Sequence, residues 1–322
     1  VLARRLRDSG RGLVLLGHFA MSHPDAAWLR ALAGYIADAT DSALNVLTHG
    51  GNAVGAWLAG AVPHRGNGDA AESPAGKHAA EMMAEPGKCA LIWDFEPDFD
   101  VNNPARAMAS LAASEKVIAV ASFATDSLRE IADVILPLAP LAESEGSLHN
   151  LNGDQMNFTS AGKASGDARP GWKILRRLGH ELGLTGFDQV SLAQVQSEMS
   201  EAIKSADVKL GEFELDSPSG GNDLFRIGEI PIYSVDALCR RSEALQQTVQ
   251  AQSQFIGLNP ADADRLGLKD GSTARVGQGG NFAELEVRVS RQVPAGGAWV
   301  RSAICATREL EQAVAPVVVE VA

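Results

Sequence analysis

At 322 residues and a net charge of -12, the chain is long enough for two domains and too acidic for non-specific binding to nucleic acid or anionic membranes. Hydrophobic residues make up 45% of it, enough for a sizeable core, yet no apolar run approaches the about 20 residues that span a bilayer. The start, VLARRLRDSG, has neither a signal peptide nor an initiator methionine, so we expect a fragment of a longer chain.

The cysteines and histidines argue against the common metal centres. Cys89, Cys239 and Cys305 are far apart and form no CxxC pair, so an iron–sulfur cluster is not expected. Buried free thiols in a reducing compartment are the favoured interpretation. The seven histidines are dispersed and include no HExxH motif. We therefore predict no metal site, and the absence of GxSxG and P-loop motifs leaves no catalytic residue to assign.

The first half of the chain alternates between strand and helix patterns. Apolar runs at 13–16, 45–47 and 89–93 predict strands. Ser22, Pro24 and Asp25 mark the start of one helix, and Asn103 and Pro104 mark the start of another. This order is typical of βαβ units, so it predicts a doubly wound, mainly parallel sheet with right-handed crossovers.

Two loops of this half carry weak binding signals. The Gly50-Gly51-Asn52 turn opens a helix and suits an anionic ligand, but it is not the GxGxxG motif of a dinucleotide site. Asp94, Glu96, Asp98 and Asp100 suggest a cation site, yet they lack the glycine and the distant glutamate of a calcium loop. A solvated strand end is the favoured interpretation of this acidic cluster.

The central stretch runs from Lys116 to Phe158. It predicts a buried strand at 117–121, a helix at 126–132 with Thr125 as N-cap, and a second short strand at 134–138. A polar, glycine-punctuated loop follows the second strand. Such a loop either forms the ligand crevice of a parallel sheet or is a solvated connection, and its composition alone leaves both open.

The last third changes character. Residues 205–228 have the composition of a linker, and 230–250 includes a helix whose Arg240 and Arg241 are expected on a solvated face rather than against a partner subunit. From Phe255 onward, short strands and turns predict a small β-barrel. We therefore expect an α/β domain at 1–204, a linker at 205–228, and a barrel domain with a leading helix at 229–322.

Four segments resemble the molybdopterin oxidoreductase superfamily. Within it, the chain is most similar to the C-terminal region of the large iron–sulfur subunit of bacterial NADH–quinone oxidoreductase, respiratory complex I. The matching segments are ADVILPLAPLAESEGSLHNLNGDQ at 132–155, Glu96-Pro97-Asp98, GDARPGWKIL at 166–175, and LNPADADRLGLKDGSTARV at 258–276. The last segment resembles the family's molybdopterin dinucleotide-binding domain, which implies a double-psi-like barrel.

The resemblance also implies a pocket that is inherited rather than used. Its candidate residues, called the pocket candidates below, are Asn52, Glu96, Glu143, Gly146, Ser147 and Asn150. The family pattern is broken at three positions, where Asn152 replaces Glu, Asp154 replaces Arg and Met156 replaces Gln. An acid in place of the arginine repels a pterin phosphate. No bound cofactor is therefore expected in this fragment.

The resemblance implies a cluster-free scaffold in the complex that carries electrons from NADH toward quinone. The full subunit would hold [2Fe–2S] and [4Fe–4S] clusters, and its partners would be other peripheral-arm subunits on the cytoplasmic side of the bacterial inner membrane. The fragment alone is expected to be inactive. One alternative is the C-terminal half of an active molybdopterin enzyme, such as a formate dehydrogenase-like protein. Another is a free-standing small-molecule binding module.

Overall fold

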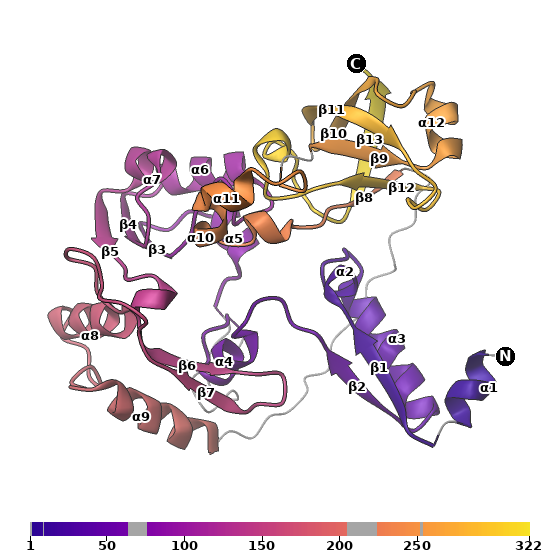
Figure 1. Ribbon diagram of the computed structural model, residues 1–322. Coiled ribbons are helices and arrows are strands. Elements are labelled where there is room, and N and C mark those ends of the chain that lie inside the picture. Colours follow the sequence, from indigo (N-terminus) through magenta and orange to yellow (C-terminus); the bar gives the residue numbers. More distant parts are fainter. Residues whose placement is uncertain (1, 9, 64–75, 205–223, 252–253) are drawn as a thin grey trace. The chain divides into compact units, whose positions relative to one another are not determined.

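The computed structural model describes residues 2–8, 10–63, 76–204, 224–251 and 254–322 (Figure 1). The chain forms two compact units, each built from separate stretches of sequence. Unit 1 combines Val1–Asn45, Phe95–Ala109 and Leu215–Ala322, and unit 2 combines Val46–Asp94 and Ser110–Glu214. Among the helices in the described ranges, none is both long enough and apolar enough to cross a membrane.

The N-terminal elements form a two-stranded sheet with one long helix. Helix α3 packs on β1 and buries the small residues Ala33 and Ala37. One face of β1 stays open, because Leu13 and Leu15 are 57% and 50% exposed. The elements are α1 (Leu2–Arg7), β1 (Gly12–Leu16), α2 (His18–Met21), α3 (Ala26–Ala39) and β2 (Ser42–Val46).

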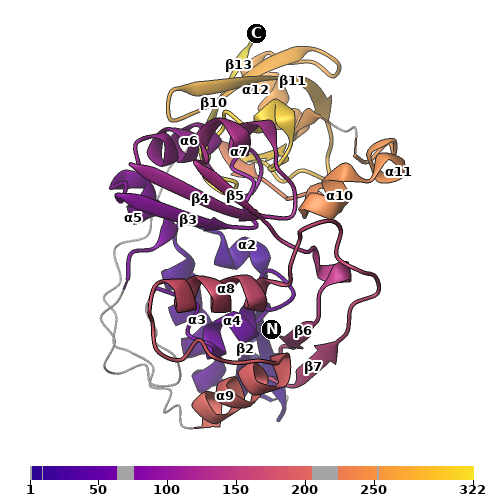
Figure 2. The ribbon, with the colours of Figure 1, turned by 90° about the vertical axis from the view of Figure 1, so that its left-hand side faces the viewer.

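Unit 2 contains a three-stranded parallel sheet. Its strands lie in the order β3 (Cys89–Trp93), β4 (Lys116–Ala121) and β5 (Val134–Pro137). Helix α7 (Asp126–Ile131) covers this sheet through Leu128, which is fully buried against Ala119 and Ala121 of β4 (Figure 2). The Thr125 hydroxyl accepts a hydrogen bond from the Leu128 N–H at 3.1 Å. The predicted strand–helix–strand order of the central stretch is therefore confirmed.

The single doubly wound sheet expected from the sequence differs from the observed arrangement. In the described residues, β1 and β2 form one sheet, and β3, β4 and β5 form another. Helix α6 (Pro104–Ala112) follows β3, and the side chain of Asn103 caps it by accepting the Arg106 N–H at 2.9 Å. Local patterns predict each strand but not which strand edges pair, because pairing depends on contacts distant in sequence.

The remaining elements of unit 2 are two short α-helices, one 3-10 helix, a hairpin and two longer helices. Pro170 and Gly171 begin α8 as predicted, and a Cβ on Gly171 would lie 2.7 Å from the Trp93 ring, so only glycine fits there. The elements are α4 (Ala53–Leu58), α5 (Ala79–Ala84), η1 (Leu141–Glu143), β6 (Gly146–His149), β7 (Gln155–Phe158), α8 (Gly171–Glu181) and α9 (Leu192–Lys204).

Unit 1 ends in a closed six-stranded barrel, as the sequence predicts. Its strands, in spatial order, are β10 (Thr273–Gln278), β11 (Asn281–Val289), β9 (Phe255–Leu258), β12 (Gly297–Val300), β8 (Leu224–Ile227) and β13 (Pro316–Val321). The pairs β11–β9 and β12–β8 are parallel, and the other four pairs are antiparallel.

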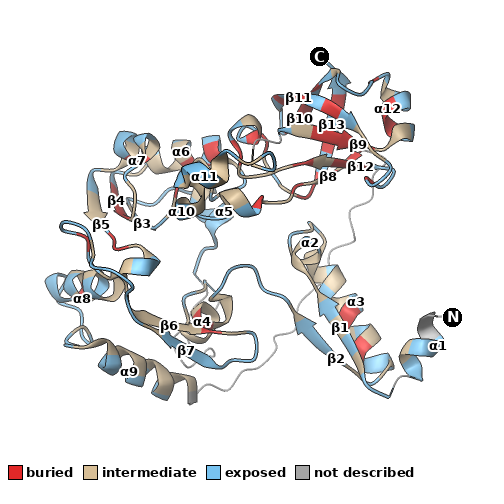
Figure 3. Ribbon diagram, in the orientation of Figure 1, coloured by how far each residue is buried: buried red, intermediate tan, exposed pale blue. Residues whose placement is uncertain are grey.

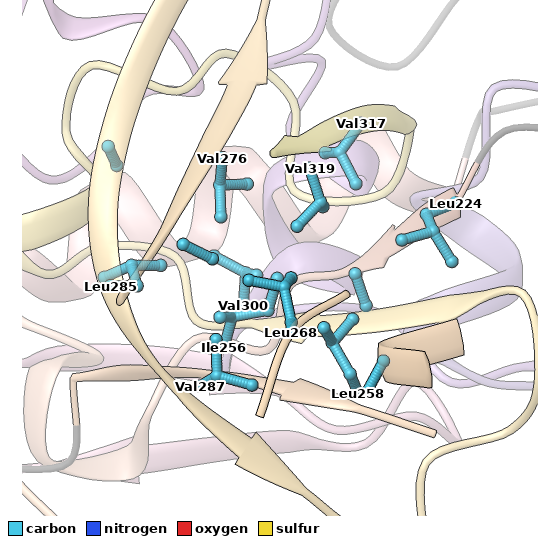
Figure 4. Close-up of a cluster of buried hydrophobic side chains, with 14 of the residues drawn as sticks. Leu224, Ile256, Leu258, Leu268, Val276, Leu285, Val287, Val300, Val317 and Val319 are labelled. Atoms are coloured by element: carbon cyan, nitrogen blue, oxygen red, sulfur yellow. The ribbon is translucent and has the colours of Figure 1, made fainter. Parts of the chain in front are cut away.

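The barrel interior is the main hydrophobic core of the described chain. Side chains from all six strands meet inside it, including Ile256, Val276 and Val300, which are fully buried (Figure 4). Buried positions accordingly concentrate on the barrel strands and on β4 (Figure 3). Helix α12 (Pro260–Leu266) follows β9, with the Asn259 side chain accepting the Ala261 N–H at its start.

The barrel begins earlier than the predicted boundary at residue 229. Strand β8 lies inside the range assigned to the linker, while 205–223 fall outside the described residues. Only four residues alternate between inside and outside in β8, a pattern too short to stand out in the sequence. The segment that follows is less helical than predicted: η2 (Ile232–Ser234), α10 (Ala237–Arg241) and α11 (Glu243–Gln246) replace one helix.

Candidate functional site

The acidic turn after β3 is an ordered turn with internal hydrogen bonds and a buried glutamate, rather than a solvated strand end. Glu96 is 4% exposed, and its backbone N–H donates to Oδ2 of Asp100 at 2.8 Å. The carbonyl of Glu96 accepts the N–H groups of Phe99 and Asp100 at 3.0 and 2.9 Å. The favoured interpretation of this cluster from the sequence is therefore wrong for Glu96.

Two arginines of α10 bind this turn within unit 1. Nε of Arg240 donates to Oε2 of Glu96 at 3.0 Å, and its Nη2 donates to Oδ1 of Asp100 at 3.0 Å. Nη2 of Arg241 lies 2.6 Å from Oε1 of Glu96, an ion pair that lacks hydrogen-bond geometry. The Arg240 guanidinium also lies over the Phe99 ring, 5.0 Å from its centroid. We call this set of contacts the arginine clamp.

The clamp corrects the expected solvated face for Arg240 and Arg241. The side chain of Arg240 is only 8% exposed, and that of Arg241 is 34% exposed. The sequence shows both partners, a pair of adjacent arginines and a cluster of carboxylates. It does not show that they meet, because 144 positions separate Arg240 from Glu96.

The acidic residue nearest the strand end has a different role. Asp94 has a left-handed backbone, with φ of 44°, which is uncommon for a residue other than glycine. Its Oδ1 accepts the Ser122 N–H at 3.0 Å, and its own N–H donates to the carbonyl of Val120 at 2.7 Å. Asp94 thus joins the ends of β3 and β4. Across the described residues, no group of His, Cys, Asp and Glu side chains has metal-binding geometry.

Asn52 meets the hairpin of unit 2. Its Oδ1 accepts the backbone N–H of His149 at 2.8 Å, and α4 packs against β6. A Cβ on Gly55 would lie 2.1 Å from the same oxygen, so the Asn52 side chain can take this position only because residue 55 is a glycine. His149 is 6% exposed, and its Nδ1 has no hydrogen-bond partner among the described residues.

Asn150 serves the turn of its own hairpin. Its Oδ1 accepts the backbone N–H groups of Asn152 and Asp154, both at 2.9 Å, and its Nδ2 donates to Oδ2 of Asp154 at 3.1 Å. Gly153, at φ of 85°, completes the turn in a conformation that favours glycine. Asn150, Asn152 and Asp154 therefore hold the β6–β7 connection together.

The other pocket candidates are also engaged within the chain. Glu143 accepts the Ser165 N–H at 3.0 Å through Oε2. A Cβ on Gly146 would lie 2.9 Å from the Phe158 ring, and Ser147 pairs with Asn157 in the hairpin ladder. The structure thus brings Asn52 together with the hairpin in unit 2, whereas Glu96 belongs to unit 1.

The donor set of the hairpin does not fit a phosphate-bearing pterin. Such a group needs cationic side chains or free N–H donors. From Gly146 to Phe158 the sequence contains no lysine or arginine, and the position of the family's arginine holds the carboxylate of Asp154. The N–H groups of Asn152 and Asp154 already donate to Asn150. The hairpin therefore presents no donor set for the phosphate of a pterin.

The structural roles of two residues are not evident from the sequence. Asp133 of the ADVILP segment accepts from Nζ of Lys116 at 2.7 Å and from the Val117 N–H at 2.8 Å, so it joins the starts of β4 and β5. Arg226 is a buried arginine of β8. Two sequence features could have drawn attention to them. Asp133 is an acidic residue directly before an apolar run, and Arg226 is an arginine inside the short apolar run LFRI.

Comparison with known proteins finds a matching family model, a curated relative and a solved structure of similar fold. The family model described as "Molybdopterin oxidoreductase" matches residues 1–181. F420-dependent formate dehydrogenase 2 subunit alpha of Methanococcus maripaludis is 24% identical over 244 residues, which are 62% of this chain and 35% of the relative. Acetylene hydratase from Pelobacter acetylenicus has a similar fold, with a TM-score of 0.50 and 14% identity over 74% of this chain and 45% of that chain. The chain thus spans about a third of the length of this curated relative.

Proposed function

The chain belongs to the molybdopterin oxidoreductase family, and we propose that it is a structural, cofactor-free portion of a larger redox enzyme of that family. More specifically, we propose the scaffold portion of the large iron–sulfur subunit of NADH–quinone oxidoreductase, respiratory complex I. In this proposal the iron–sulfur clusters lie elsewhere in the subunit. This portion packs against peripheral-arm subunits on the cytoplasmic side of the bacterial inner membrane, and it has no catalytic residue of its own.

The observation that carries the proposal is the arginine clamp. The Glu-Pro-Asp turn stands at the place of the turn that binds nucleotide in the family's molybdenum enzymes, and it resembles the version found in complex I subunits. Here the Glu96 carboxylate is buried and paired with Arg240 and Arg241, so it is not available to a nucleotide. A buried carboxylate gives up two arginine partners only at a large cost in free energy. This arrangement supports a role in holding unit 1 together.

The alternative is the C-terminal portion of an active molybdopterin enzyme. The similarity to a formate dehydrogenase subunit favours it. The hairpin of unit 2 speaks against it, because Asp154 supplies a negative charge where a phosphate needs a positive one. The same hairpin supports the scaffold proposal, since its polar groups stabilise its own turn.

Titration calorimetry of the 322-residue chain with guanosine diphosphate tests the proposal. We expect no saturable heat with the wild-type chain, because the clamp occupies the carboxylate of the turn. Saturable binding that Glu96→Gln abolishes would contradict the scaffold proposal and favour the active enzyme. The matched control is Glu130→Gln, which removes an exposed carboxylate on α7.

A further inference from the structure

The outer wall of the barrel carries a cavity of about 600 Å³. It lies over the neighbouring strands β11, β9, β12 and β8 and is walled by the loop between β11 and β12. Its lining includes Phe255, Trp299, Arg288, Val293 and Pro294. The side chains of Phe255, Arg288 and Trp299 point away from the barrel interior, which is filled by the alternate residues Ile256, Val287 and Val300. We call this cavity the wall groove.

A glycine allows the floor of the wall groove to form. Gly257 of β9 pairs with Arg288 of β11 on one side and with Trp299 of β12 on the other. A Cβ at Gly257 would lie 3.2 Å from Val293 and 3.3 Å from the Trp299 ring. The indole and Val293 therefore close over the strand, where any larger residue would push them outward into the groove.

Two perpendicular aromatic rings form the floor. Phe255 and Trp299 meet edge to face, with centroids 5.1 Å apart and ring planes at 81°. The Arg288 guanidinium covers Phe255 at 4.0 Å from the ring centroid. Because Arg288 covers one face of Phe255, a further aromatic ring would meet the floor through the remaining surface of the two rings.

Two of the three charged side chains at the rim are paired with each other, since Nε of Arg288 lies 3.7 Å from Oε1 of Glu286. The third, Asp270, accepts the neutral Val289 N–H through Oδ1 at 2.8 Å. The described lining therefore carries a net negative charge, which disfavours an anionic ligand. Otherwise its selectivity rests on shape and on aromatic surface.

We propose that the wall groove binds a small ligand that is built around a planar aromatic ring and carries no negative charge. The cavity volume lies in the range of about 300–1,000 Å³ that is typical of small-molecule sites. The ring packs between the aromatic floor and the wall of Val293 and Pro294. This inference rests on the barrel alone and is independent of the proposed function of the chain.

The neighbouring pair of strands provides an internal control. On β10 and β11, Gly277 pairs with Phe282, and a Cβ at Gly277 would lie 2.6 Å from the Phe282 ring. Arg275 covers this ring at 3.6 Å from its centroid. This site therefore has the same combination of a glycine, an aromatic ring and an arginine, but neither Phe282 nor Arg275 lines the wall groove.

Ligand-observed NMR on the full 322-residue chain tests the proposal with four probes of one size. They are 2-naphthalenemethanol, its saturated decahydro analogue, 2-naphthoate and 2-naphthylmethylammonium. We expect saturable binding of the neutral aromatic probe and at least about tenfold weaker binding of the saturated probe, which cannot stack. 2-Naphthoate should also bind more weakly because the Asp270 carboxylate repels it, whereas 2-naphthylmethylammonium should bind at least as tightly as the neutral aromatic probe. Equal binding of all four probes, or binding of none, would overturn the proposal.

Variants then locate the binding. Trp299→Leu and Phe255→Leu should each weaken the affinity for 2-naphthalenemethanol by about three- to tenfold, whereas Phe282→Leu should leave this affinity unchanged. Gln292→Trp tests the same site without changing the floor, so it remains informative if the floor variants fail to fold. It places an indole ring at the mouth of the wall groove from an exposed loop, and it should block binding of the probe. An unchanged affinity in Gln292→Trp, or an equal loss in Phe282→Leu, would refute the assignment to the wall groove.

Discussion

Arg226 is a charged residue inside the barrel whose described acceptors include no carboxylate. Nε donates to the carbonyl of Val300 at 3.1 Å. The two Nη atoms donate to the side chains of Gln278 and Ser302 and to the carbonyls of Arg301 and Gln312, at 2.8 to 3.3 Å. All five guanidinium donors are thus used. Burial lowers the pKa of Arg226 to about 10, which still leaves it charged at neutral pH.

Replacing Arg226 by lysine should destabilise the barrel. An ammonium group offers three donors in place of five and cannot reach the same spread of carbonyls, so buried acceptors lose their partners. We expect Arg226→Lys to lower the free energy of unfolding by about 2–4 kcal/mol, measured by urea denaturation. The control is Arg275→Lys, at an arginine that lies over Phe282 on the outer wall. A loss no larger than in this control would show that the five hydrogen bonds matter little.

Asp133 should contribute stability that depends on pH. The hydrogen bond from Lys116, followed by that from the Val117 N–H, lowers the pKa of Asp133 below its ordinary value of 3.8. A carboxylate with a lowered pKa stabilises the fold fully above its ordinary value, and this stability is lost as the pH falls through the lowered value. We therefore expect the melting temperature of Asp133→Asn to depend less on pH in this acidic range than that of the wild type. Glu130→Gln is the control, and equal acid sensitivity of the wild type and Asp133→Asn would contradict the expectation.

At the scale of elements, the arginine clamp joins α10 to the turn after β3. Removing one partner of a buried ion pair leaves the other charge uncompensated. We expect Arg240→Met to cost about 3 kcal/mol of unfolding free energy. A double-mutant cycle with Glu96→Gln should show a coupling of about 2 kcal/mol.

The control for this cycle is the exposed pair of Arg177 and Glu181 on α8, whose side chains are 70% and 57% exposed. Its coupling should not exceed about 0.5 kcal/mol, because solvent screens exposed ion pairs. If the Glu96 and Arg240 effects simply added, the clamp would contribute no more than an exposed ion pair, and the main support for the scaffold proposal would be lost.

Elements with local signals were predictable from the sequence, and elements held by distant contacts were not. Thr125 and the apolar run before it predict α7 and β4, because a cap and a buried strand are each encoded within a few residues. The alternation from Glu284 to Val289 predicts β11 in the same way. In contrast, β8 is short, and its place between β12 and β13 depends on partners more than 70 positions away.

The candidate site follows the same rule. The sequence singled out Glu96, Asp100, Arg240 and Arg241 but gave no reason to pair them. It singled out Asn52 and Asn150, and the structure connects Asn52 to the hairpin through the backbone of His149. Whether the pocket candidates descend from a cofactor pocket stays a prediction. Their present contacts are hydrogen bonds, ion pairs and packing within the chain.

In the whole molecule, membership of the family coexists with a hairpin whose donor set does not fit a pterin phosphate. The match over residues 1–181 shows the family. The paired Glu96 carboxylate and the acidic Asp154 support the proposal that this portion of the protein is structural. These two findings are compatible if the redox centres of the whole protein lie outside this chain.

Metal and pterin analysis of the native protein that contains this chain tests that claim most directly. Elemental analysis measures iron, molybdenum and tungsten, and the fluorescence of the oxidised extract measures pterin. We predict iron without molybdenum, tungsten or pterin. Stoichiometric molybdenum or tungsten together with pterin would contradict the scaffold proposal and would identify the protein as an active molybdopterin enzyme.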